Sequence, residues 1–270
     1  AILTRLVGSE MCIRASLKYA FEDDSVGITI GENESNVNNI VIGHELDDYL
    51  LEYCSDNNID TVITYHPPPY KKITEEDDSE NFLPDSITTS FIDSSINVIT
   101  IHTAQDVCNG GNADSLVDLF GITDTKVFAH TVGKFGAGRY GNIPKTSNSE
   151  LKEIVESKLN TKIVRTNEYF QEIKEINTIA ILPGSGTQFL EEIISKVDVF
   201  ITGDISHRYL LKGDETHLGL IQVNHLSTEI PGMTRFVNNL SNQLGTQLEY
   251  FYNKYYDCLL YTSPSPRDAL

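Results

Sequence analysis

Residues 62–69 of the chain read Val-Ile-Thr-Tyr-His-Pro-Pro-Pro. The first half is a short, β-branched apolar run that ends at His66, and prolines follow at once. Runs of this kind are typical of buried strands in an α/β sheet. Because α/β sheets bind their ligands at the carboxyl ends of strands, the stretch predicts a buried strand with a functional histidine at its end.

Two further apolar runs end in the same way, at His102 and at His225. Each of these histidines is followed four residues later by a carboxylate, Asp106 or Glu229. If the segment turns helically, the two side chains share one face and can hold a divalent ion. Imidazole with carboxylate suits zinc, iron, manganese, cobalt or nickel, and a shared carboxylate can bridge two ions. The alternative is that all three are hydrogen-bonded histidines at strand ends, without a metal.

The chain alternates helix-like and strand-like patterns. Helices are predicted at residues 45–57, 112–120, 147–159, 188–195 and 228–240. Strands are predicted at residues 62–66, 98–102, 162–165, 178–182, 197–202 and 220–225. In the last helix, Pro231 is expected to fit only in the first turn. The pattern predicts an α/β fold of two lobes, residues 16–135 and 136–257, with their boundary in the glycine-rich stretch 133–141.

The two ends of the chain are expected to be foreign to the fold. Residues 6–14 and 258–268 resemble translated sequencing-adapter sequence, so the native protein is expected to run from about Ser16 to Asp257. The chain does not begin with methionine. A cytoplasmic location is the expectation, and because a natural N-terminal targeting signal could precede this chain, a mitochondrial or nuclear location is left open.

The composition excludes several classes of protein. A formal net charge of -19 repels phosphate backbones, which predicts no direct binding to nucleic acid. Part of this charge lies in the acidic run 75–80, expected to be a solvated loop, with a partner-binding tail as the alternative. Cys54 and Cys108, the cysteines outside the two end segments, predict neither a disulfide framework nor a structural zinc site. No apolar run reaches membrane-spanning length, so a soluble, intracellular protein is expected.

Five motifs occur in an order that resembles one known family. They are Thr64–Pro69, His102–Asp106, Gly184–Gly186, Thr202–His207 and His225–Glu229. Together they resemble the Nif-three-like family, also labelled type 2 homologues of GTP cyclohydrolase one, over about residues 24–229. The tyrosine before His66 and the prolines after it resemble the eukaryotic branch.

The resemblance implies a two-lobed α/β protein with sheets flanked by helices and a dinuclear metal site in a cleft. It also implies a homo-oligomer, assembled as a toroidal hexamer of dimers. Carried over by position, His66, Asp106 and Glu229 would hold one metal, and His225 with the bridging Glu229 would hold the other. His102 would lie beside them as a ligand or as a partner of the ligands.

Tyr65 stands where the bacterial pattern of the family has a histidine that serves the second metal. Neutral phenol is a poor ligand near pH 7, so one firmly bound and one labile divalent ion are expected. Tyr65 is either a ligand or an ordinary strand-end aromatic residue with its hydroxyl in the cleft.

The later motif departs from the family in two places, where Asp204 replaces a glutamate and Arg208 replaces a histidine. Asp204 or His207 is expected to move protons as a catalytic residue, and a hydrogen-bonding or capping role is the alternative. Arg208 either meets an anionic substrate or forms a surface ion pair. The turn 184–186 either binds phosphate through its backbone or reverses the chain.

The function that these residues predict is a metal-dependent hydrolase acting on a small nucleotide-like or phosphate-bearing metabolite. The alternatives are a metal-stabilised protein that binds transcription co-regulators or other partners without catalysis, and a metal-trafficking or metal-sensing protein. The expected partners are accordingly a small substrate, further copies of the chain and possible protein partners, with no nucleic acid and no membrane.

Overall fold

The computed structural model describes residues 17–31, 37–72 and 82–252, and these residues form two compact α/β units. Unit 1 contains the described residues up to Gln105 together with residues 236–252, and unit 2 contains residues 106–235. The end segments 6–14 and 258–268 and the acidic run 75–80 lie outside the described residues. None of the helices that the structure describes is long and apolar enough to cross a membrane.

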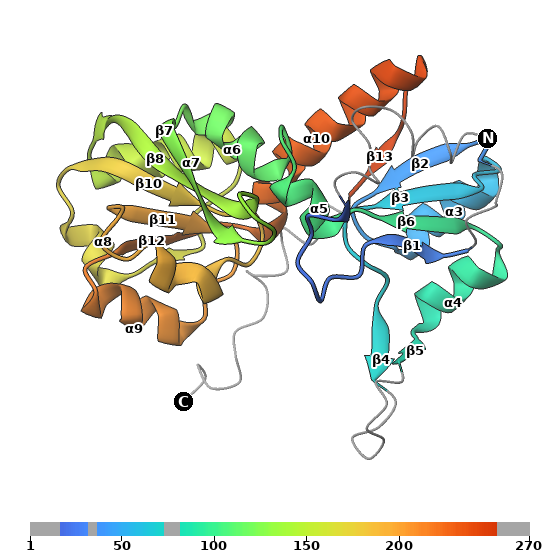
Figure 1. Ribbon diagram of the computed structural model, residues 1–270, viewed down its shortest axis with the longest axis horizontal. Helices are drawn as coiled ribbons and strands as arrows, with labels where there is room; N and C mark the ends of the chain where they lie inside the picture. The colour runs from blue at the N-terminus through green and yellow to red at the C-terminus, as the bar shows by residue number, and fades with distance from the viewer. Residues whose placement is uncertain (1–16, 32–36, 73–81, 253–270) are drawn as a thin grey trace. The chain divides into compact units, whose positions relative to one another are not determined.

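Unit 1 is built on a sheet in the order β1-β6-β3-β2-β13 (Figure 1). Its strands are β1 (Gly27–Ile30), β2 (Ile40–Gly43), β3 (Thr61–Thr64), β6 (Asn97–Thr100) and β13 (Tyr250–Phe251). β6, β3, β2 and β13 run parallel, and β1 is antiparallel to β6. A separate antiparallel pair is formed by β4 (Tyr70–Lys72) and β5 (Phe82–Pro84). The carboxyl ends of the parallel strands therefore lie at the same edge of the sheet.

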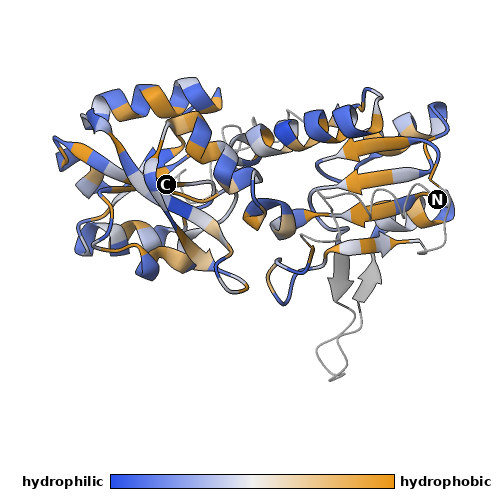
Figure 2. Ribbon diagram, turned by 45° about the horizontal axis from the view of Figure 1, so that its top comes forward, coloured by the Kyte–Doolittle hydropathy of each residue, from blue (hydrophilic) through white to orange (hydrophobic). Residues whose placement is uncertain are grey.

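Two helices supply the apolar layer of unit 1, α3 (Asp48–Asp56) and α4 (Ser86–Asp93). Figure 2 shows the strands of this sheet in the hydrophobic colour, whereas the helices carry both colours. Apolar residues on successive parallel strands stand in register, so that they form a continuous surface for the helices. The buried residues of this layer include Val41, Val62 and Val98 from the strands and Leu50, Cys54 and Phe91 from the helices.

Unit 2 is built on a second sheet, in the order β7-β8-β10-β11-β12-β9. Its strands are β7 (Thr123–His130), β8 (Gly136–Thr146), β9 (Arg165–Thr166), β10 (Ile176–Ile181), β11 (Val199–Thr202) and β12 (Gly219–Gln222). β10, β11 and β12 run parallel. Its helices are α6 (Asn112–Phe120), α7 (Asn148–Leu159), α8 (Glu168–Glu172), the 3₁₀ helix η1 (Thr187–Glu192) and α9 (His207–Glu215).

Isoleucines on the three parallel strands of unit 2 stand opposite one another, at Ile181, Ile201 and Ile221. They belong to a buried cluster with Leu151 of α7 and Leu116 of α6. Each such side chain contributes roughly 1.5–3 kcal/mol by leaving water. Two helices have residues in both units: α5 (His102–Val107) and α10 (His225–Leu244).

The boundary between the units lies elsewhere than in the predicted stretch 133–141. That stretch is the turn of the β7–β8 hairpin and the first half of β8. Its glycines are needed for close strand contact, because a Cβ on Gly138 would clash with the ring of Phe128. The glycines of this stretch are therefore explained by the tight packing of β7 against β8. The two units are instead divided between Gln105 and Asp106 and between Arg235 and Phe236.

Three predicted elements differ from the structure. The helix predicted at 188–195 is the 3₁₀ helix η1, held by bonds such as Phe189 N–H to Gly186 O. The strand predicted at 162–165 is reduced to the two residues of β9. The last helix begins at His225 rather than near 228, so Pro231 lies beyond the first turn. The Asn224 side chain accepts a hydrogen bond from Ser227 N–H, which is the bond that an N-cap residue makes.

The predicted start of α7 is confirmed, since Ser147 and Glu150 form a capping box. Hydrogen bonds from Ser147 to the Glu150 carboxylate lower the pKa of that carboxyl. We expect Ser147→Ala to lower the free energy of unfolding by about 1 kcal/mol in urea denaturation, because an orphan N–H at the helix start loses its acceptor. Ser206→Ala is the matched control, because Ser206 is the N-cap of α9 but its side chain makes no capping bond. An equal loss in both variants would contradict the assignment.

Candidate metal centre

Three histidines of unit 1 follow adjacent parallel strands at their carboxyl ends. His44 follows β2, His66 follows β3, and His102 follows β6 as the first residue of α5. The backbones stay in register past the strands, because His66 N–H donates to His44 O at 2.9 Å and His102 N–H to Tyr65 O at 2.9 Å. The ring centroids of His44 and His66 are 5.0 Å apart, and those of His66 and His102 are 5.4 Å apart. The predicted convergence of strand-end histidines is therefore present for His66 and His102.

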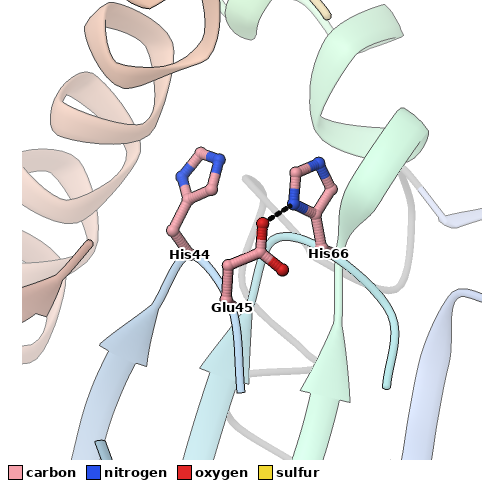
Figure 3. Close-up of side chains that lie close together, drawn as sticks. All are labelled: His44, Glu45 and His66. Atoms are coloured by element: carbon pink, nitrogen blue, oxygen red, sulfur yellow. Dashed lines mark hydrogen bonds and ion pairs between the residues drawn. The ribbon is translucent and has the colours of Figure 1, made fainter. Parts of the chain in front are cut away.

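A carboxylate holds Nδ1 of two of these rings. Glu45 Oε1 lies 2.6 Å from His66 Nδ1 (Figure 3), and Asp24 Oδ1 lies 2.6 Å from His102 Nδ1. Asp24 also accepts hydrogen bonds from the backbone N–H and the hydroxyl of Thr103. Burial alone would raise the pKa of Asp24, but the bonds from His102 and Thr103 outweigh it and lower that pKa.

His44, Glu45 and His66 form a group that sequence reasoning missed. One ligand atom from each lies within 4.8 Å of the others, a separation that suits a metal ion. Figure 3 shows both imidazoles and the carboxylate beyond the ends of neighbouring strands. The Nδ1 atom of His44 lies 2.7 Å from the hydroxyl of Tyr250 in β13. The available signal was the apolar run 40–43, which ends in a histidine and a glutamate.

In unit 2, His225 lies between two carboxylates at the carboxyl ends of β11 and β12. Its Nδ1 atom is 2.6 Å from Asp204 Oδ2, and its Nε2 atom is 2.9 Å from Glu229 Oε1. Glu229 is only 1% exposed. Burial alone would lower the pKa of His225, but the hydrogen bonds to Asp204 and Glu229 and the charges of these carboxylates raise it to about 10. The predicted pair at spacing four is thus formed on the first turn of α10.

Asp106, the other predicted carboxylate, is buried in α5 at 5% exposure. Asn112 Nδ2 donates a hydrogen bond to its Oδ1 atom at 2.9 Å. The amide of Asn112 thereby fixes the orientation of the Asp106 carboxylate, because it binds one oxygen specifically.

The glycine turn after β10 passes close to His225 and Glu229. Gly184 has a φ of +65°, and a Cβ there would lie 2.7 Å from Glu229 Oε1 and 3.1 Å from His225 Nε2. Its N–H donates to the Thr228 hydroxyl at 2.8 Å. That amide is therefore engaged within the protein, which favours the chain-reversal interpretation of this turn over the phosphate-binding one.

The remaining predicted residues have more ordinary surroundings. Tyr65 is 1% exposed, and its ring lies 4.9 Å from those of His44 and His66, so the structure places it beside the histidines in agreement with either interpretation. Asp204 is hydrogen-bonded to His225, which is the alternative that the sequence left open beside proton transfer. His207 is exposed at the start of α9, and the exposed Arg208 stacks over the ring of Tyr209.

Neither Cys54 nor Cys108 forms a disulfide with another described residue. Burial raises the pKa of each to about 12, and the nearby Asp106 and Asp114 carboxylates contribute at Cys108. Neither is a ready thiolate ligand near neutral pH, so nitrogen and oxygen are the donor atoms to consider.

The fold and these residues define a class of protein: a two-unit α/β protein with histidine–carboxylate groups at the carboxyl ends of parallel strands. The comparison with family models is more particular. The chain belongs to the Duf34/NIF3 (NGG1p interacting factor 3) family, whose model matches residues 10–256. That match begins inside the segment 6–14.

Two curated relatives illustrate the similarity. A protein of Clostridium acetobutylicum named GTP cyclohydrolase 1 type 2 homolog is 30% identical over 234 residues, which cover 85% of each chain. NIF3-like protein 1 of Drosophila melanogaster is 24% identical over 265 residues, which cover 95% of this chain and 84% of that protein.

Solved structures share the fold. The crystal structure of Staphylococcus aureus hypothetical protein SA1388 has a TM-score of 0.72 and 21% identity, and covers 98% of this chain and 97% of its own. Reduced HcgD from Methanocaldococcus jannaschii has a TM-score of 0.71 and 21% identity, and covers 86% of this chain and 91% of its own. The predicted mixed α/β fold of this family is confirmed.

Proposed function

We propose that this protein binds divalent metal ions and hydrolyses a small nucleotide-like or phosphate-bearing metabolite. The observation that carries the proposal is the pairing of His225 with the buried carboxylate of Glu229, at 2.9 Å, beside the carboxyl ends of parallel strands. A buried carboxylate requires a compensating positive charge, which protonated His225 supplies when no ion is bound. A divalent cation at the same atoms would replace the proton on Nε2, because metal binding to histidine releases a proton.

The donor set fits such an ion. Nitrogen and oxygen donors are present in both units, at His66 and His102 in unit 1 and at Asp106, His225 and Glu229 in unit 2. Imidazole with carboxylate suits zinc, iron, manganese, cobalt and nickel alike. The glycine at position 184 leaves room beside His225 Nε2 and Glu229 Oε1 that any larger residue would fill. His66, Asp106 and Glu229 are assigned to the firmly bound ion and His225 with Glu229 to the labile one, as the family resemblance implies.

A bound divalent ion lowers the pKa of water from 15.7 to roughly 7 and polarises a carbonyl or phosphoryl oxygen. The residues of the chain supply the rest. Asp106 and Glu229 bring negative charge into the buried site, and Asp204 holds the proton at His225 Nδ1. His207, exposed at the start of α9, is the residue assigned to exchange protons with the substrate.

The substrate class is supported by the names of the relatives, several of which are called GTP cyclohydrolase 1 type 2 homolog. A nucleotide or a related phosphate-bearing compound is the class that this name indicates. An acidic chain needs bound cations to accept such an anion, because its own net charge of -19 repels it.

The test joins metal analysis with a substrate screen. We expect protein loaded with Zn²⁺, Mn²⁺ or Co²⁺ to retain metal through gel filtration and to hydrolyse at least one compound in a panel of nucleotides and phosphoesters. Chelator-treated protein should lose this turnover and regain it when metal is returned. Asp106→Asn should lose metal and turnover together, because it removes a buried anionic donor.

Two results would contradict the proposal. Turnover that persists in metal-free Asp106→Asn protein would separate the activity from the metal. Retained metal without turnover on any compound of the panel, alongside a specific protein partner in pull-downs, would favour the interaction protein instead.

A further inference from the structure

We propose that Asp24, Glu45 and Asp204 are positioning residues that orient three histidine rings so that Nε2 is the metal-binding atom of each ring. The inference rests on the proposed metal binding and assigns a role to three carboxylates. The three histidines are His66, His102 and His225.

The three pairs have the same geometry. In each pair a carboxylate oxygen lies 2.6 Å from Nδ1 of the ring. The partners are 21, 78 and 21 residues apart along the chain, and the pairs are distributed over both units. Because the partners lie 21 or 78 residues apart, the fold and not the local sequence brings each carboxylate to its ring.

The physical consequence of each contact is a fixed tautomer. A neutral imidazole carries one N–H, and a carboxylate is only an acceptor, so the proton is drawn to Nδ1. Nε2 is then left with its lone pair as the ligand atom, and the hydrogen bond also fixes the plane of the ring. Carboxylate partners of this kind make the ring a stronger donor to a metal.

The other contacts of these carboxylates and histidines are consistent with a positioning role. Asp24 is itself anchored by the backbone N–H and hydroxyl of Thr103, so that its oxygen is held in place for His102. In the pair that involves Asp204, the opposite nitrogen of His225 faces the buried Glu229 at 2.9 Å, so Nε2 also carries a proton until a metal ion takes its place.

His44 provides the contrast within unit 1. Its Nδ1 atom contacts the Tyr250 hydroxyl at 2.7 Å instead of a carboxylate. A phenol hydroxyl can donate or accept, so it does not fix the tautomer in the way that a carboxylate does. His44 is therefore outside the set of ligands in this inference, although it stands next to Glu45 and His66 (Figure 3).

The experiment measures the Kd for Zn²⁺ by competition with a chromophoric chelator. Asp24→Asn, Glu45→Gln and Asp204→Asn are each expected to weaken binding by about 10–100-fold, the range for partners of metal ligands. Glu45→Asp and Asp204→Glu keep the carboxylate and should recover most of the affinity. Asp47→Asn is the matched control near Glu45, because Asp47 caps α3 through Leu50 N–H and contacts no histidine in the described bonds.

A second measurement reads the geometry directly. In Zn²⁺-loaded protein with ¹⁵N-labelled histidine, long-range ¹H–¹⁵N spectra should show Nδ1 protonated and Nε2 coordinated for all three rings. Thermal unfolding of each metal-free variant separates a loss of affinity from a loss of folding.

Each contrary outcome rejects a different statement. Wild-type protein that binds Zn²⁺, with unchanged Kd in all three variants, rejects the positioning role. Coordination through Nδ1 of His66, with weaker binding in His44→Gln, places the ion among His44, Glu45 and His66 and also rejects it. Wild-type protein that binds no Zn²⁺ rejects the proposed function and this inference with it.

Discussion

Glu229→Gln is expected to lower the affinity for Zn²⁺ by more than about 100-fold, beyond the range for residues that only support a metal ligand. The carboxylate is 1% exposed and its Oε1 atom lies 2.9 Å from His225 Nε2. An amide of nearly the same shape fills the same space but removes the negative charge. The substitution therefore acts on the charge that the buried site offers to a cation, and titration calorimetry with Zn²⁺ measures the loss.

The control for this variant is Asp118→Asn. Asp118 is an exposed carboxylate of α6 that forms an ion pair with Arg235 at 2.7 Å. Exposed pairs of this kind contribute only about 0–1 kcal/mol, and the affinity for Zn²⁺ should not change. Equal affinities of Glu229→Gln and wild-type protein, both folded by circular dichroism, would remove Glu229 from the metal site.

Much of the fold follows from local patterns, because each of these patterns has one dominant physical cause. The apolar runs before His66, His102 and His225 are β3, β6 and β12, and α6 matches its predicted range. The glycine at position 121 ends α6 in the left-handed conformation, as helix-ending glycines do. For these segments, the local pattern of apolar and polar side chains is sufficient to distinguish a buried strand from a helix.

The differences arise where a second effect competes with the local pattern. The stretch 133–141 reads as a linker because glycine is common in linkers, but the close approach of β7 and β8 requires the same residue. Pro231 reads as a first-turn residue, but the capping bond of Asn224 starts the helix earlier. Both effects depend on neighbours that only the folded chain supplies.

The residues of the candidate site likewise include some that the sequence predicts and others that it does not. Histidines at strand ends can be found from the sequence, because the apolar run before each one marks a buried strand. Their carboxylate partners cannot, because Asp24 reaches His102 only through the fold, across 78 residues. Glu45 could be predicted only in part. It follows β2, which pairs with the strand before His66, but neither segment of sequence shows that these two strands pair.

Gly184→Ala is expected to damage both stability and metal binding. The φ of +65° costs a residue with a Cβ about 1–3 kcal/mol, and the added carbon would lie 2.7 Å from Glu229 Oε1 and 3.1 Å from His225 Nε2. One of these side chains must move, and the affinity for Zn²⁺ should fall by about tenfold or more, as when the support of a ligand is lost.

Gly121→Ala separates the two effects. Gly121 has nearly the same backbone conformation, with a φ of +67°, but nothing lies within 4 Å of a Cβ placed there. Its substitution should therefore cost the backbone strain alone, so that urea denaturation shows a loss of stability while the Kd for Zn²⁺ stays at the wild-type value. If Gly184→Ala only matched Gly121→Ala in both measurements, the close passage of this turn over His225 and Glu229 would have no part in metal binding. A larger loss of affinity at position 184 would instead show that the glycine is required by the ligands beneath it rather than by the turn.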